Sequence, residues 1–327
     1  MTIFQYLPIF KKKREDYLKD TKTFVCVNDG WNVDLKSPNI KAMVFDTETL
    51  HSFVKKKGKK QDFKEIKDII ELALIILKNN GLRVYKAIYG FIIKEFWEDK
   101  NYLYSKNWQC KDKKNNIWEQ IKNFGKLKYK KWRLFLKKGL LNLLNWEDTL
   151  KQLGRIIQYY GVNLICAYND KFDLQAMYQT SQIIQEKYYP TRENNYYYCG
   201  NFWEVPKIDI LKMVEEWLKI PENALAFTSW CDEHGLKRDT GNYPMTAEIW
   251  CQFALRDTNF LSLIQELDST NWCETHIALE DVDCESIVYQ YLILTYPGEH
   301  FYVPLCEHGH ACRANKIIRE TLMTIQQ

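Results

Sequence analysis

Two carboxylates stand one residue apart in the stretch VFDTET, residues 44–49. The run Ala42–Phe45 before them is apolar and predicts a buried strand. Alternate side chains of a strand share a face, so Asp46 and Glu48 are expected to point the same way, about 7 Å apart. Buried carboxylates are costly unless a positive charge neutralises them, and Mg²⁺ or Mn²⁺ prefers oxygen ligands. The pair therefore indicates a site for a hard divalent cation.

A third carboxylate is expected at the same edge of the sheet. Asp173 lies in AYNDKFDLQAM, at the start of a helix that follows the short apolar strand VNLICAY. Function in α/β folds gathers at the carboxyl ends of strands, so Asp173 is favoured as a ligand. Asp170 in the same turn is the alternative, although local capping also explains its position. Asp209 in KIDIL is expected to order a strand-to-helix turn rather than to bind metal.

The segment ETHIALEDVDCE offers a base and a further ligand. On one continuous helix His276 and Asp281, five positions apart, would point about 140° away from each other. If His276 precedes the helix and Asp281 lies on its second turn, both can reach the same cation-bound water. Histidine is suited to take a proton from such a water because it titrates near neutral pH.

The stretches FDTET, NDKFD and HIALED resemble, in order and spacing, the three motifs of the DEDDh group of the DnaQ-like 3′→5′ exonuclease superfamily. The resemblance implies an α/β, RNase H-like fold, with a mixed five-stranded sheet and helices on both faces. It also implies a metal-dependent enzyme that releases nucleoside monophosphates from single-stranded DNA ends by two-metal-ion phosphodiester hydrolysis.

The same resemblance implies the roles of individual residues. Two Mg²⁺ or Mn²⁺ ions would be bridged by Asp46, with Glu48 and Asp281 as further ligands of the metal site. Asp173 would hold the second ion and His276 would be the general base. Asn169 matches a common motif-two asparagine and would serve the turn or contact the substrate.

A second stretch, CQFALRDTNF, also resembles the third motif, with Asp257 in the place of the aspartate. The positions of the proton acceptor hold Gln252 and Phe253, which cannot take a proton from water. His276 and Asp281 are therefore preferred.

Basic charge is concentrated between Lys106 and Lys138, where twelve Lys and Arg residues face two acidic ones, against a formal net charge of +4 for the chain. Interleaved aromatic residues could stack on bases beside phosphate-seeking charges. The candidate nucleic-acid contacts are Lys128, Lys130, Lys131, Arg133 and Trp132. The alternative is a solvated, partly helical insertion whose aromatic residues pack on the domain.

The predicted organisation is an N-terminal extension over 1–40, an exonuclease domain over 41–293 and a C-terminal extension over 294–327. The domain carries the basic aromatic insertion at about 100–143, a second insertion at about 180–205 and a helical spacer at about 222–274. A hairpin is expected after the first strand. A helix is expected between Asn145, as N-cap, and Gly161, as its end.

The stretch CEHGHAC places Cys306, His308, His310 and Cys312 at strict alternation, all residue types that bind zinc. An extended strand would spread them over about 20 Å, so a single zinc site requires the chain to fold back at Gly309. The alternative is an edge strand or loop without metal.

The composition of 327 residues, 46% hydrophobic with ten scattered cysteines, predicts a packed protein with reduced thiols in the cytoplasm, or in a host cytoplasm if a phage encodes it. No signal peptide or membrane span is expected. The expected partner is single-stranded nucleic acid with a free 3′ end, DNA favoured over RNA, and a DNA polymerase or replication protein is a further candidate. The competing functions are an exoribonuclease and a non-catalytic nucleic-acid-binding or polymerase-associated module.

Overall fold

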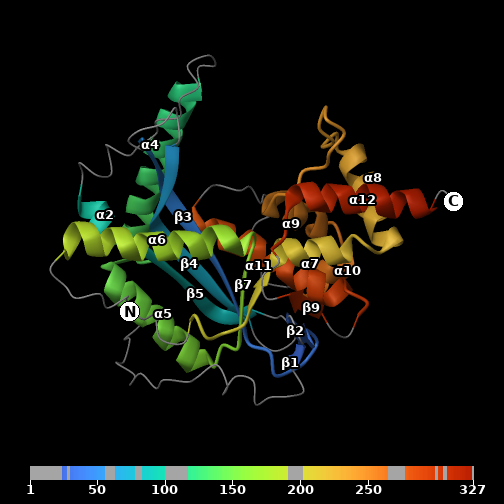
Figure 1. The fold of residues 1–327 in the computed structure, drawn as a ribbon, viewed down its shortest axis with the longest axis horizontal. Coiled ribbons are helices and arrows are strands. Elements are labelled where there is room, and N and C mark those ends of the chain that lie inside the picture. The colour runs from blue at the N-terminus through green and yellow to red at the C-terminus, as the bar shows by residue number, and fades with distance from the viewer. Residues whose placement is uncertain are drawn as a thin grey trace.

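The computed structural model describes residues 24–27, 30–55, 63–77, 83–99, 117–190, 202–263, 277–298, 301–304 and 308–325. Its centre is a six-stranded mixed sheet in the order β6-β5-β4-β3-β7-β8 (Figure 1). The strands are β3 (Ala42–Lys55), β4 (Phe63–Leu77), β5 (Arg83–Ile93), β6 (Asn142–Leu144), β7 (Leu164–Ala167) and β8 (Lys207–Asp209).

Strands β3, β4 and β5 run antiparallel in succession, whereas β7 is parallel to β3, β8 is parallel to β7 and β6 is parallel to β5. The predicted α/β class, the mixed sheet and the hairpin after the first strand are confirmed. The predicted count of five strands is wrong. The sixth, β6, is three residues long, too short for a recognisable pattern, and forms by pairing with Phe91–Ile93 at the sheet edge.

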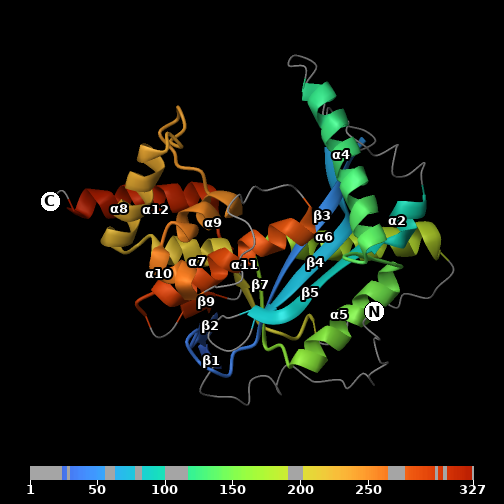
Figure 2. The same cartoon turned by 180° about the vertical axis from the view of Figure 1, so that it is seen from behind.

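Alternation along β3 divides the core into two layers. Ala42 and Val44 belong to a cluster with helix α11 (Ala278–Thr295), whereas Met43 and Phe45 belong to one with α5 (Trp146–Tyr160) and α6 (Asp170–Tyr188). The two views agree, since α6 crosses in front of the sheet in Figure 1 and α11 crosses in front of it in Figure 2. Continuing the alternation, Asp46 and Glu48 point toward the α11 side.

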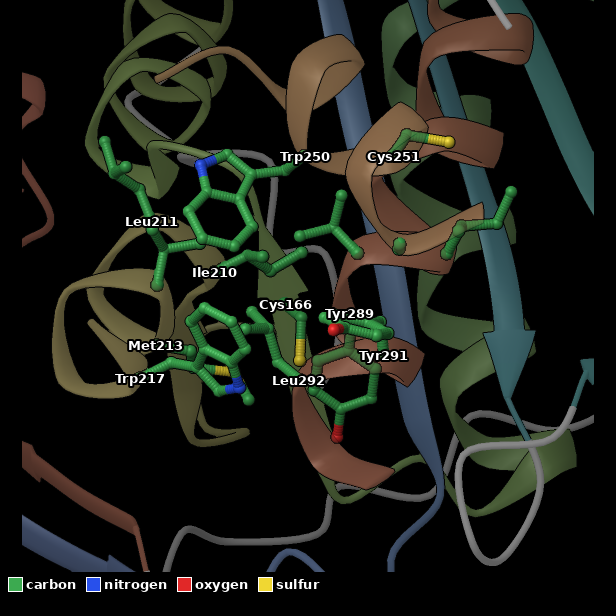
Figure 3. Close-up of a cluster of buried hydrophobic side chains, with 14 of the residues drawn as sticks. Cys166, Ile210, Leu211, Met213, Trp217, Trp250, Cys251, Tyr289, Tyr291 and Leu292 are labelled. Carbon is green, nitrogen blue, oxygen red and sulfur yellow. The ribbon is translucent and has the colours of Figure 1, made fainter. Parts of the chain in front are cut away.

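Further helices gather beyond β8: α7 (Ile210–Trp217), α8 (Pro221–Glu233), α9 (Ala247–Leu255), α10 (Thr258–Leu263) and α12 (Ala311–Ile325). Their core is aromatic. Trp250 of α9 stacks on Phe227 with ring centroids 4.2 Å apart and meets Trp217 of α7 edge-on at 5.5 Å. Tyr291 of α11, labelled in Figure 3, meets Trp217 of α7 with ring centroids 6.0 Å apart and Phe253 of α9 at 5.8 Å. This packing fixes α11 against α7 and α9, so the predicted spacer buttresses the helix that carries Asp281.

The two terminal extensions meet in a second, three-stranded sheet. Strand β2 (Gly30–Val33) pairs with β1 (Phe24–Val27) on one side and with β9 (Phe301–Pro304) on the other, both antiparallel. The N-terminal extension therefore contains strands that its irregular sequence did not predict.

Two further helices lie beside the sheet, α2 (Lys94–Glu98) next to β5 and α4 (Ile117–Lys138) next to β3 and β4, the second lying within the predicted basic insertion. Figure 2 shows α4 standing beside the outer parts of β3 and β4. In the described part of the chain, none of the helices has the length and apolar character needed to cross a membrane.

Glu71 of β4 holds three of these elements together. Its fully buried carboxylate accepts hydrogen bonds from Trp132 Nε1 of α4 at 2.6 Å and from the backbone N–H groups of Ala278 (3.0 Å) and Leu279 (3.1 Å). The N-cap residue of α11, Ile277, provides no side-chain cap. Glu71 therefore satisfies the free N–H groups that begin α11. Burial raises its pKa from 4.5 to about 7 despite these donors.

Because the pKa of Glu71 is higher in the folded state, folding favours the protonated carboxyl. Its contribution to stability is complete below the unfolded pKa of 4.5 and is lost as the pH rises through about 7. Glu71→Gln removes this titration. We expect the free energy of unfolding of the wild type, relative to Glu71→Gln, to fall by about 2.5 kcal/mol between pH 5 and pH 8 in urea titrations. The exposed control Glu98→Gln should show no such trend, and a constant difference for Glu71→Gln would contradict the assignment.

Candidate metal centre

The acidic stretch of β3 begins where the neighbouring strand ends. Strand β7 pairs only with Ala42–Val44, so the edge of β3 is open on that side from Asp46 onward. The first turn of α6 fills the opening. Asp173 Oδ1 accepts hydrogen bonds from Thr47 N at 3.1 Å and Thr47 Oγ1 at 2.5 Å. A side chain thus replaces a strand partner, and the predicted motif-two carboxylate lies beside the predicted motif-one pair.

Three carboxylates converge on the α11 face. One ligand atom each of Asp46, Glu48 and Asp281 lie within 4.8 Å of one another. Asp281 is on the first turn of α11, rather than the second turn expected from the sequence, and is buried. The pairing register of β3 and β4 shifts directly after Glu48, a bulge of the kind that re-aims side chains next to functional sites.

The arrangement fits a hard cation. Asp46 Oδ2 is buried and makes no hydrogen bond within the described residues. Burial raises the pKa of Asp46 well above its ordinary value, and the charges of Glu285, Asp173, Glu48 and Asp281 raise it further. Burial also raises the pKa of Asp173 to about 7. A buried carboxylate oxygen without a hydrogen-bond partner, surrounded by other carboxylates, provides the oxygen ligands that Mg²⁺ and Mn²⁺ prefer.

Glu285 was missed in the sequence. It lies one helical turn after Asp281, is buried, and accepts a hydrogen bond from Tyr168 N at 3.1 Å. Its charge contributes more than any other to the raised pKa of Asp46. The signal was present, because acidic residues four apart on a helix share a face. The third motif, HIALED, ends at Asp281 and does not include Glu285.

Helix α4 contributes to the centre rather than only to its surroundings. Lys128 Nζ lies 2.7 Å from Glu48 Oε2, and both side chains are largely buried. Lys131 Nζ pairs with Glu280 of α11 at 2.5 Å. Trp132 is 3% exposed and bonded to Glu71, so its ring offers no face for base stacking. Of the five predicted nucleic-acid contacts, Lys130 and Arg133 are exposed. The inward side of this amphipathic helix is held by acids on distant strands and helices.

The remaining motif residues separate into three cases. His276 lies outside the described residues. Asn169 adopts a left-handed backbone conformation (φ 63°), which asparagine tolerates, and it lines the pocket beside the carboxylates. Asp257 caps α10, accepting from Asn259 N at 2.9 Å and Phe260 N at 3.1 Å. Among the described residues Asp257 joins neither group of potential metal ligands, in line with the preference for Asp281.

A second group contains Asp170, Asp209 and His308, with ligand atoms within 4.8 Å of one another. Backbone donors satisfy Asp209. Its Oδ1 accepts from Asn169 N (3.0 Å) and Leu211 N (2.8 Å), and its Oδ2 accepts from Gly309 N (2.9 Å). Asp209 therefore orders the turn before α7, as predicted. Asp170 lies 2.5 Å from His308 Nδ1 and belongs to this second group, so the choice of Asp173 over Asp170 as the motif-two ligand stays a prediction.

Of the possible zinc ligands, the three that the structure describes, His308, His310 and Cys312, form no common group of ligand atoms. His308 contacts Asp170, and His310 Nδ1 accepts a hydrogen bond from Cys312 N at 3.2 Å. Cys312 lies in the first turn of α12 and is exposed. Alternation along a strand is interrupted because α12 starts at Ala311. Cys306 lies outside the described residues, so zinc binding stays an untested prediction.

Comparison with known proteins adds no family to this picture, because neither a scan of protein-family models nor a search of curated proteins gives a match to the chain. The geometry of the carboxylates and the motif resemblance carry the functional argument.

The Asp46→Asn variant should separate the destabilisation caused by the clustered carboxylates from their contribution to metal binding. Without divalent metal at pH 8 we expect this variant to unfold at a higher temperature than the wild type, because one of several repelling charges is removed. Mn²⁺ at a hundred times its dissociation constant should stabilise the wild type by about 2.7 kcal/mol and the variant much less. Thermal unfolding with chelator and with Mn²⁺ measures both effects. Asp257→Asn is the matched control, and an equal Mn²⁺ shift in Asp46→Asn would exclude Asp46 as a ligand.

Proposed function

We propose that the chain is a metal-dependent 3′→5′ exonuclease that releases nucleoside monophosphates from single-stranded DNA. One observation carries this proposal. Asp281, which is far from Asp46 and Glu48 in the sequence, has a ligand atom within 4.8 Å of theirs, and one buried oxygen of Asp46 has no hydrogen-bond partner among the described residues. Asp173 lies beside them, because its carboxylate accepts a hydrogen bond from the backbone N–H of Thr47.

The strand order supports the proposal of an RNase H-like fold. Without the edge strand β6 the sheet reads β5-β4-β3-β7-β8, with the first strand of the series at the centre and only β4 antiparallel to it among its neighbours. The acidic residues lie on this central strand, where helices from both faces can reach them. This is the arrangement that the three-motif resemblance implies.

In the proposed reaction Asp46, Glu48, Asp173 and Asp281 would hold the divalent cations. When bound, such cations would supply Lewis-acid stabilisation of the phosphate and acidify a water. The chain fixes the ligands: Lys128 holds one oxygen of Glu48, and Thr47 holds one oxygen of Asp173. His276 is retained as the proposed general base on the sequence resemblance alone.

The proposed path of the strand follows α4. Lys130 and Arg133 are exposed on the same helix that delivers Lys128 to Glu48. Cations at these positions can contact successive phosphates of a strand whose 3′ end lies among the carboxylates.

The function is tested with 5′-labelled single-stranded DNA and RNA of the same sequence. We expect a ladder that shortens from the 3′ end with Mg²⁺ or Mn²⁺ and no cleavage with chelator. Asp46→Asn and Asp281→Asn should each lower the rate at least about 10³-fold, because each removes a metal ligand. Asp257→Asn should cleave like the wild type. Absence of cleavage with binding intact would favour the non-catalytic module, and faster cleavage of RNA would favour the exoribonuclease.

The strand path is tested by the salt dependence of binding in Ca²⁺. Lys130→Gln with Arg133→Gln should weaken binding and reduce the slope of log K against log salt by about 1.4, since each lost phosphate contact with a single strand removes about 0.7. Lys316→Gln with Arg319→Gln is a matched control, because these exposed residues have the same spacing on α12. An unchanged slope in the α4 variant would remove this helix from the interface.

A further inference from the structure

Four of the acidic residues line a pocket of about 490 Å³: Asp46, Glu48, Asp173 and Glu285. The C-terminal segment 309–311 and the start of α9 line the same pocket. Among the described residues that line the pocket, His310 has the only side chain that can carry a positive charge, whereas Asp46, Glu48, Asp173 and Glu285 are acids. A polyanionic substrate entering this pocket meets His310 as the complementary group of the protein itself.

The segment that carries His310 is tightly fixed to β8 and α7. Gly309 N donates to Asp209 Oδ2 at 2.9 Å, and His310 N donates to Glu215 Oε1 at 2.6 Å. The other oxygen of Glu215, a fully buried residue, forms an ion pair with Arg313 Nε at 2.7 Å. A Cβ at position 309 would lie 2.5 Å from the backbone of Leu211, so only glycine permits this approach. The position of His310 is therefore set by the fold.

His310 lines the pocket, and one nitrogen of its ring is engaged in a hydrogen bond. Its Nδ1 accepts the N–H of Cys312 at 3.2 Å, and its carbonyl accepts the N–H of Ala314 at 3.0 Å, so His310 caps α12. Because Nδ1 is an acceptor, the neutral ring carries its proton on Nε2. Nε2 is then a hydrogen-bond donor, suited to an anionic oxygen and unsuited to taking a proton from water.

We infer that His310 is a substrate-binding residue whose Nε2–H donates a hydrogen bond to a phosphate oxygen of the nucleic-acid strand held in the pocket. The inference rests on the proposed exonuclease function, and it gives the C-terminal extension a part in the site. It also separates two histidines, with His276 as the proposed base and His310 as a phosphate contact.

Two substitutions distinguish this role from simple capping. Asn places an acceptor near the position of Nδ1 and keeps the cap, whereas Gln places an amide donor near the position of Nε2. We expect His310→Asn to retain the unfolding temperature of the wild type but to bind a 3′-terminal DNA oligonucleotide about tenfold more weakly in Ca²⁺, which supports binding without turnover. His310→Gln should restore most of the binding.

A neutral methylphosphonate, placed at each 3′-terminal linkage in turn, locates the contact. At the contacted phosphate the wild type should lose about tenfold in affinity, and His310→Asn should lose almost nothing further, because its contact is already absent. At other linkages both proteins should lose the same factor.

The outcomes separate the inference from the function on which it rests. If the wild type neither binds nor cleaves the oligonucleotide, the proposed exonuclease fails. If the wild type binds and cleaves, and His310→Asn matches it in affinity, then His310 only caps α12 and the inference is overturned. Equal losses in His310→Asn and the wild type at every methylphosphonate position would overturn it as well.

Discussion

The candidate metal centre depends on the hydrogen bonds accepted by one buried carboxylate, Glu71. Glu48 and Glu71 are directly opposite in the β3–β4 ladder. Glu71 begins α11 by accepting its first N–H groups, which places Asp281 over the acidic stretch of β3. The Trp132 Nε1–H bond to the same carboxylate anchors α4, and Lys128, one turn earlier, then reaches Glu48. A single side chain on β4 thus sets the distance between the carboxylates carried by β3 and by α11.

The burial and mutual repulsion of these carboxylates destabilise the folded protein. Asp46 has acids on β3, α6 and α11 around it, and burial and their charges oppose its ionisation. Lys128 relieves Glu48 but not Asp46, whose Oδ2 has no hydrogen bond among the described residues. Perturbed acids with this degree of burial are characteristic of functional sites, because the stability they cost is recovered when a ligand neutralises them. The aromatic packing of α7 and α9 against α11 is what holds such groups together in the absence of a cation.

Sequence signals with local causes were sufficient for much of the architecture. Asn145 caps α5 by accepting from Asp148 N, and Gly161 ends it with φ 64°, both as predicted, because these preferences act within one helical turn. The strands β3, β4 and β7 followed from apolar runs. The errors share another cause. Lys128 and Trp132 were assigned to nucleic acid because their partners, Glu48 and Glu71, lie far away in the chain. The pairing of β2 with β9 joins the two extensions and leaves no local pattern to detect.

The second sheet and the segment from His308 onward have a consequence for synthesis on the ribosome. Asp46 and Glu48 leave the exit tunnel before α11 and the C-terminal segment have been synthesised. A nascent chain that stops before Ile277 lacks Asp281, Glu285 and His310, and its β2 lacks the partner β9. Because domains acquire long-range contacts only after the distant segment has been translated, the acids of α11 join those of β3 late in synthesis. Translation order therefore keeps this group of carboxylates from forming on a chain that lacks α11.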